Sequence, residues 1–152
     1  MFDFKSLSSS QQFALNIFVP MLYLLPLVFA YLGPKNFGFG FRSLVYSGLF
    51  IGISGLLLWV VAMWSLGSSL AVLPGTDQLV TKGVYRVVRH PVYIGIVLTL
   101  TGLFVACGSL ACLVYVGVVV IPLNVFRAKA EEEVLLEQLG ATYKKYKDST
   151  LC

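Results

Sequence analysis

The chain has 152 residues, of which 58% are hydrophobic and only 12% are charged, and its mean hydropathy is +0.86. A soluble domain of this size cannot bury so much apolar surface, so the composition indicates an integral membrane protein with one domain over residues 1–152. The net charge of +4 does not predict a nucleic-acid partner, because the basic residues cluster at the ends of apolar runs, as membrane-flanking charges do.

The first apolar run covers residues 14–32 and is long enough to cross a hydrocarbon core of roughly 30 Å as a helix. Pro20 and Pro26 lie inside it and predict a kink. A signal peptide is the alternative, but the run is too long for one and residues 30–32 make a poor cleavage site. We therefore expect a retained first span.

The second run, residues 44–66, contains no charge. Its glycines Gly48, Gly52 and Gly55 have the spacing that lets helix backbones approach closely. This pattern predicts a second span that packs tightly against another helix.

The third apolar stretch, residues 92–126, contains no charge over 35 positions, which is too long for one span. A break is expected between Gly102 and Ser109, where small residues loosen the helix. The result is a tight hairpin of two helices, at about 91–105 and 110–127. Cys107 and Cys112 fall in this stretch and are interpreted as small core residues.

The distribution of positive charge predicts the topology of these four spans. With four spans, the N-terminus, the loop 67–90 and the tail 128–152 lie on one side of the membrane. That side carries nine basic residues against two on the other, namely Lys5, Lys82, Arg86, Arg89, Arg127, Lys129, Lys144, Lys145 and Lys147 against Lys35 and Arg42. Because positive loops stay inside, both termini and the loop are expected on the cytoplasmic side of the inner or plasma membrane.

After Arg127 the sequence becomes polar and its apolar residues follow a helical spacing. Leu135, Leu139, Tyr143 and Tyr146 form one stripe, and Gly140 is expected to bend the helix. This amphipathic C-terminal helix either lies on the membrane surface or covers the cytoplasmic loop. The predicted fold class is therefore all-α and polytopic, with four transmembrane helices and a cytoplasmic amphipathic helix.

Two polar segments flank the predicted hairpin, and the hairpin brings them together. His90 precedes Pro91, which suits the first turn of a helix whose free N–H groups attract a carboxylate or phosphate. A lone histidine does not predict a metal site. Glu131, Glu132 and Glu133 are either solvated residues at the membrane edge or ligands for a cation, and Arg127 is either snorkelling to the interface or part of that site.

Two motifs in these segments have a fixed order. The first reads Leu79-Val-Thr-Lys-Gly-Val-Tyr-Arg-Val-Val-Arg-His-Pro-Val-Tyr-Ile-Gly95. The second consists of Arg127, Glu131, Glu132, Leu135, Leu139, Gly140, Tyr143 and Tyr146. Together they resemble the isoprenylcysteine carboxyl methyltransferase family and the related phospholipid methyltransferases, over roughly the C-terminal half of the chain.

The resemblance implies a membrane enzyme that uses S-adenosyl-L-methionine and methylates a lipid-like or prenylated acceptor, with carboxyl O-methylation favoured by the Leu-Val-Thr-x-Gly-Val-Tyr lead-in. It implies that Arg127 binds the acceptor and that His90 also belongs to the catalytic site. It further implies contacts to the methyl donor from Gln78, Leu79, Val80, Tyr85, His90, Pro91, Val92, Tyr93 and Glu131. The residue types are suitable, since a sulfonium cation is attracted by tyrosine rings and a carboxylate, and a guanidinium can bind an acceptor carboxylate through two hydrogen bonds.

The sequence also departs from the eukaryotic carboxyl methyltransferases. Asp77 stands where they often have histidine, the tail lacks their Val-Pro after the second tyrosine, and residues 1–152 contain no counterpart of their additional N-terminal spans. Three alternatives stay open: a phospholipid N-methyltransferase, a sterol-reductase-like protein that binds NADPH through a similar Arg-His-Pro-x-Tyr segment, and a non-catalytic membrane protein. The sequence does not predict the acceptor or the oligomeric state.

Overall fold

The computed structural model describes residues 21–28, 30–32, 41–67 and 79–151, and these residues form helices and short connections without a named strand. An apolar helix Met21–Leu32 comes first. It is followed by α2 (Arg42–Leu66), the short 3₁₀ helix η3 (Gly83–Arg86), α3 (Pro91–Cys107), α4 (Leu110–Tyr115), the π-helical turn η4 (Val116–Val120), α5 (Ile121–Leu139) and α6 (Ala141–Ser149). The all-α prediction is confirmed, while residues 14–20 of the expected first span lie outside the described residues.

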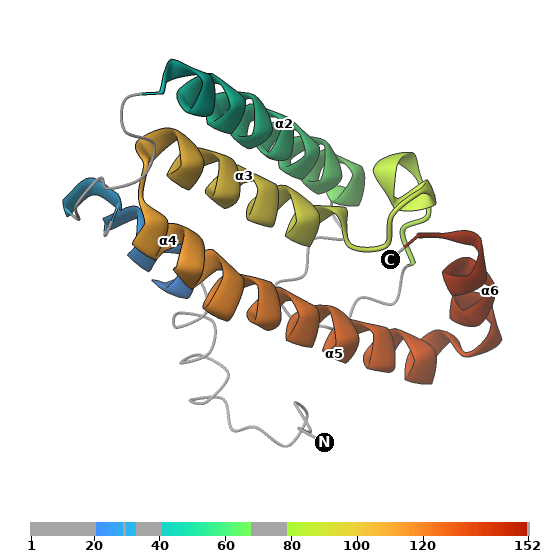
Figure 1. Cartoon of the computed structure of the whole chain (residues 1–152). Helices are drawn as coiled ribbons and strands as arrows, with labels where there is room; N and C mark the ends of the chain where they lie inside the picture. The colour runs from blue at the N-terminus through green and yellow to red at the C-terminus, as the bar shows by residue number, and fades with distance from the viewer. Residues whose placement is uncertain (1–20, 29, 33–40, 68–78, 152) are drawn as a thin grey trace.

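Helices α2 and α3 lie side by side and antiparallel (Figure 1), and glycines form their contact. A Cβ atom added to Gly102 would lie 2.1 Å from the backbone nitrogen of Gly52, and one added to Gly48 would lie 2.5 Å from that of Ala106. The expected close packing of the α2 glycines is therefore confirmed. The expectation that Gly102 loosens the chain is wrong: it lies within α3, where its missing side chain lets α2 approach.

The turn of the hairpin lies at Gly108 and Ser109, at the far end of the expected interval. Gly108 adopts the left-handed conformation with φ of 69°, and its N–H bonds to the carbonyls of Phe104 and Val105. The Ser109 hydroxyl then accepts a hydrogen bond from the Cys112 N–H and caps the next helix. The predicted hairpin is confirmed, with α3 extending two residues beyond the expected end.

The second arm of the hairpin is one long helix rather than a span that ends at Arg127. Residues Leu110–Leu139 are continuous through α4, η4 and α5, which gives a length of about 45 Å. Pro122 explains the π turn, because its ring clashes with the carbonyl four residues earlier and it offers no N–H. Gly140, with φ of 50°, then ends α5 and α6 follows, as the sequence predicted.

Two of the helices have the length and composition of membrane spans, Arg42–Leu66 and Leu110–Leu139. Helix α3 and the Met21–Leu32 helix are apolar but shorter. Large apolar side chains on α2, such as Phe50 and Trp64, are exposed, as expected for a surface that faces lipid. Because the continuous helix Leu110–Leu139 is about 45 Å long, a span built from it would project beyond a hydrocarbon core of roughly 30 Å.

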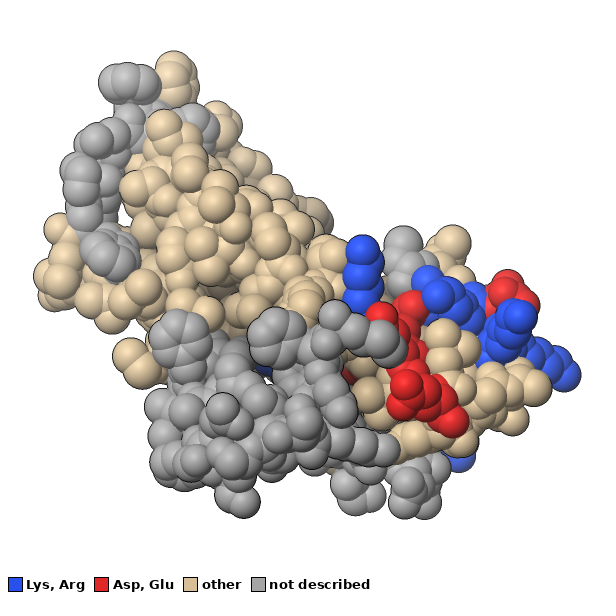
Figure 2. Space-filling model, turned by 90° about the horizontal axis from the view of Figure 1, so that it is seen from below, with Lys and Arg blue, Asp and Glu red and all other residues tan. Residues whose placement is uncertain are grey.

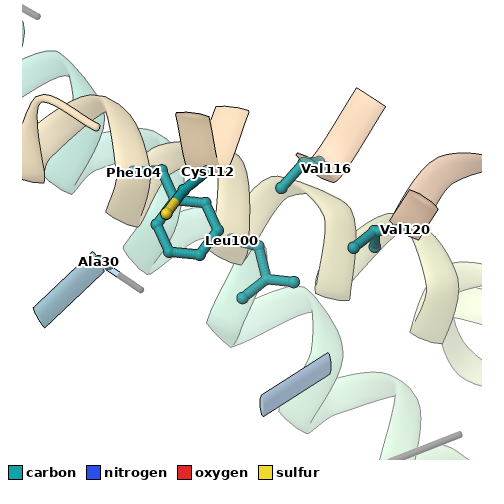
Figure 3. Close-up of a cluster of buried hydrophobic side chains, with 6 residues drawn as sticks. All are labelled: Ala30, Leu100, Phe104, Cys112, Val116 and Val120. Carbon is teal, nitrogen blue, oxygen red and sulfur yellow. The ribbon is translucent and has the colours of Figure 1, made fainter. Parts of the chain in front are cut away.

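A small apolar core joins the Met21–Leu32 helix to the hairpin (Figure 3). Its buried members are Ala30, Leu100, Phe104, Cys112, Val116 and Val120. The Tyr115 hydroxyl donates to the Leu22 carbonyl at 3.0 Å, and the Cys112 thiol lies 3.5 Å from the Pro26 carbonyl. Cys112 is thus a core residue as expected, whereas Cys107 is only half-buried.

The glycine contact predicts that Gly102→Ala destabilises the protein. The added methyl group has to displace the backbone of α2, and such overpacking costs about 1–3 kcal/mol, so we expect a lower melting temperature in detergent. Gly117→Ala is the matched control, because nothing lies within 4 Å of its added Cβ. Equal melting temperatures of the two variants would contradict the assigned contact.

Candidate functional site

The charged side chains gather at one end of the molecule on the face seen in Figure 2. There the loop with η3, the first turn of α3, the second half of α5 and α6 come together (Figure 1). The two polar segments that flank the hairpin in sequence are in direct contact, because Tyr93 of α3 reaches Glu131 of α5.

Tyr93 is the centre of this contact. Its hydroxyl donates a hydrogen bond to Glu131 Oε1, and its ring stacks on His90 with centroids 5.7 Å apart and an interplanar angle of 25°. On the same ring, the guanidinium carbon of Arg127 lies 5.6 Å from the centroid. Thus a cation and a carboxylate, four residues apart on α5, meet at one aromatic ring.

The start of α3 contributes backbone donors to the same place. His90 is the N-cap residue but its side chain makes no capping hydrogen bond, and Pro91 occupies the first turn. The N–H groups of Val92 and Tyr93 have no carbonyl within the helix to bond, and they lie at the positive end of the helix dipole. This helix start can therefore bind a carboxylate or phosphate group.

His90 itself lies between two glutamates. Its Nδ1 is 3.8 Å from Glu131 Oε2, and its Nε2 is 3.4 Å from Glu132 Oε1. Both ring nitrogens therefore face carboxylate oxygens. The imidazole is held at the junction of α3 and α5 next to the Tyr93 ring.

Glu132 contacts cations from two other parts of the chain. Arg89 Nε lies 3.0 Å from Oε1 in an ion pair that is not aligned as a hydrogen bond, and Lys147 Nζ bonds to Oε2 at 2.8 Å. Burial by itself raises the pKa of Glu132, but the hydrogen bonds from Lys147 and His90 and the charges of Lys147 and Arg89 outweigh it and hold the pKa below 4.5. The ionised form is therefore the one that these contacts stabilise.

The chain end is attached to the loop before α3 through backbone bonds. The Leu151 N–H donates to the Val87 carbonyl at 2.9 Å, and the Arg89 N–H donates to the Leu151 carbonyl at 3.2 Å. The Arg89 side chain adds a 2.9 Å bond to the Lys147 carbonyl. We call residues 147–151, together with Arg89 and Glu132, the C-terminal clasp.

The tyrosines of the predicted amphipathic stripe pack inward against the loop. Tyr143 is buried, which raises its pKa to about 12 with a further contribution from the charge of Glu132. The Tyr146 hydroxyl donates to the carbonyl of Tyr85 at 2.6 Å, and Tyr85 is itself buried. This segment therefore contacts the loop before α3.

The remaining predicted site residues are placed as follows. Leu79 and Val80 are half-buried and lead into η3, and Pro91 is buried at the start of α3. Gln78 and Asp77 lie outside the described residues. Contact of these residues with a methyl donor stays a prediction.

Two residues of this region were missed by the sequence-based site prediction. Arg89 lies in the first motif next to His90, and that position could have indicated it. For Lys147 there was no such signal, since its contact with Glu132 depends on how α6 folds back.

Comparison with known proteins gives one result. The profile of the phospholipid methyltransferase family matches residues 43–142, from the first turn of α2 to the first turn of α6. No curated protein and no solved structure matches the chain. The chain therefore belongs to the phospholipid methyltransferase family of membrane methyltransferases, which confirms the resemblance and adds α2 to the matched region.

The clasp predicts that Glu132→Gln loosens α6. Loss of a charged hydrogen bond should lower the protection of α6 amides in hydrogen–deuterium exchange by about tenfold. Glu133→Gln is the control, because Glu133 is its exposed neighbour on the same helix. Equal protection in both variants would contradict a structural role for Glu132.

The lowered pKa of Glu132 also predicts how the clasp responds to acid. A carboxylate with a depressed pKa in the folded state contributes stability that is fully present above its ordinary value of 4.5 and is lost as the pH falls through the lower folded value. Amide protection of α6, corrected for intrinsic exchange, should therefore stay constant down to about pH 5 and fall below it. In Glu132→Gln this acid-dependent step should be absent, and an unchanged step there would assign it to another group.

Proposed function

We propose that the chain binds S-adenosyl-L-methionine beside Tyr93 and Glu131 and transfers the methyl group to the carboxylate of a lipid-like acceptor held by Arg127. The observation that supports this most is the shared ring of Tyr93, which has Glu131 at its hydroxyl and Arg127 over its face. A cationic donor and an anionic acceptor need such opposite charges at adjacent points.

The residues present are suited to a sulfonium cofactor. Glu131 is one-third exposed, so its carboxylate can be reached by a cation, and Arg127 already shows that the Tyr93 ring accepts one. The free N–H groups at the start of α3 suit the methionine carboxylate. By family resemblance, Gln78, Leu79, Val80, Tyr85, Pro91 and Val92 complete the donor site.

Methyl transfer to a carboxylate requires little proton transfer by the protein. Bound S-adenosyl-L-methionine supplies an electrophilic methyl group. Arg127 holds the acceptor carboxylate in line by paired hydrogen bonds, and that oxygen is already deprotonated at neutral pH, so no base is required. Because transfer cancels a positive and a negative charge, a site at the end of an apolar bundle that excludes water favours it.

Phospholipid N-methylation is the second candidate, and the name of the matched family favours it. An amine acceptor has to lose a proton during transfer. His90, with its ring nitrogens 3.8 and 3.4 Å from the carboxylates of Glu131 and Glu132, is the residue that would take part in this step.

We further propose that the protein has the membrane arrangement expected from the sequence. Residues 1–152 form one domain with four spans, and both termini and the site lie on the cytoplasmic side. The charge distribution supports this arrangement, and so does the length of the continuous helix Leu110–Leu139, which at about 45 Å exceeds a hydrocarbon core of roughly 30 Å. The acceptor then reaches Arg127 from the bilayer, between helices.

Donor binding tests the assigned roles. We expect calorimetry in detergent to detect S-adenosylhomocysteine binding, with Tyr93→Ala and Glu131→Ala weakening it at least tenfold, about 1.4 kcal/mol. Arg127→Ala should bind the donor normally and transfer no methyl group, and Glu133→Ala should resemble the unchanged protein. A heat of binding with NADPH, together with no heat of binding with S-adenosylmethionine or S-adenosylhomocysteine, would contradict the proposal.

The reaction product separates the two candidate acceptors. After incubation with methyl-labelled S-adenosylmethionine and extracted membrane lipids, a carboxyl methyl ester releases labelled methanol in mild alkali, whereas an N-methyl group does not. We expect the label to be released as volatile methanol after the alkaline treatment. Label that stays with the lipid after alkaline treatment would favour N-methylation instead.

A further inference from the structure

Asn124 is a buried polar residue in the apolar part of α5. The residue is only 4% exposed, and the Tyr23 hydroxyl donates a hydrogen bond to its Oδ1 atom. The amide nitrogen Nδ2 is buried and has no hydrogen-bond partner among the described residues. An amide N–H without a partner in an apolar bundle is costly, so a ligand that supplies an acceptor would be stabilised there.

Helix packing explains the hydrogen bond at Oδ1 of Asn124 but leaves its amide nitrogen without a role. Oδ1 is sufficient to bind Tyr23 and thereby attach the Met21–Leu32 helix to α5. The same helix is attached a second time through the Tyr115 hydroxyl and the Leu22 carbonyl. Neither contact uses the N–H donors of Asn124.

The position of Asn124 relates these donors to the proposed site. Residues 124, 127 and 131 share one face of α5, at the i, i+3 and i+7 positions. Along the helix axis Arg127 is about 4.5 Å from Asn124, and Glu131 about 10.5 Å from it. The face therefore presents an amide, a guanidinium and a carboxylate in that order, starting from the apolar core at Val120.

We propose that Asn124 Nδ2 and Arg127 bind the same oxyanion in the head group of the lipid acceptor, so that Asn124 is a specificity-determining residue. This rests on the proposed methyl transfer and on Arg127 as the acceptor ligand. Both groups offer only N–H donors, since Oδ1 of Asn124 is taken by Tyr23. The pair therefore selects a head group with two acceptor oxygens, a carboxylate or a phosphodiester, with Glu131 left for the cationic donor one turn beyond Arg127.

The test is equilibrium binding of two labelled amphiphiles to the full chain in nanodiscs with S-adenosylhomocysteine present. An S-farnesylated cysteine supplies the carboxylate and phosphatidylethanolamine supplies the phosphodiester, so the probe that binds identifies the oxyanion. Asn124→Leu should weaken its binding by about 10- to 100-fold, the effect of one hydrogen bond to a charged group, and leave the dissociation constant of S-adenosylhomocysteine unchanged. Tyr115→Phe is the matched control, because it loosens the same helix without touching Asn124.

Binding of neither probe, or equal losses in Asn124→Leu and Tyr115→Phe, would overturn the inference. If Asn124→Leu does not fold, Asn124→Asp replaces it, because this variant keeps the acceptor for Tyr23 and removes the N–H donors. Amphiphile binding by Asn124→Asp that is as tight as in the unchanged protein would also overturn the inference. If S-adenosylhomocysteine does not bind but Asn124→Leu still weakens binding of the amphiphile, the result contradicts the proposed methyl transfer and supports the oxyanion subsite.

Discussion

The hydrogen bond between Tyr93 and Glu131 joins the first turn of α3 to the second half of α5, and the arrangement of the site depends on it. Helices in an apolar medium satisfy their backbone groups internally and are therefore stiff. The turn at Gly108 fixes one end of this pair, and the glycine contact with α2 holds α3 in place. A contact at the other end then determines where Arg127 lies relative to the start of α3.

Glu131 and Glu132 are adjacent in the sequence but have different surroundings. Glu132 is paired with Arg89 and Lys147, and it attaches the chain end to the loop before α3. Glu131 is more exposed and accepts a hydrogen bond from Tyr93. Since the two positions are about 100° apart around the helix, Glu132 contacts Lys147 of α6 whereas Glu131 contacts Tyr93 of α3. Of the two carboxyl groups, that of Glu131 is therefore the more accessible.

Much of the fold could be predicted from the sequence, because apolar runs and glycine positions are local signals. The hairpin, the α2 packing face and the break at Gly140 all follow from them. The end of the long helix could not, since Arg127 marks where apolar character stops, whereas the Ala-Lys-Ala-Glu-Glu-Glu segment after it favours helix and continues it. The C-terminal clasp could not be predicted from local sequence patterns either, because its contact between Arg89 and Lys147 joins residues 58 positions apart.

Binding of a methyl donor where the two motifs meet is the part of the proposed function that can be tested most directly. Ultraviolet cross-linking of methyl-labelled S-adenosylmethionine to the protein in its own membranes, followed by peptide mapping, tests this directly. We expect label in the peptides that contain Tyr93 and Glu131, and loss of that label when S-adenosylhomocysteine is added. Label confined to the residues before α2, or label that S-adenosylhomocysteine does not displace, would contradict it.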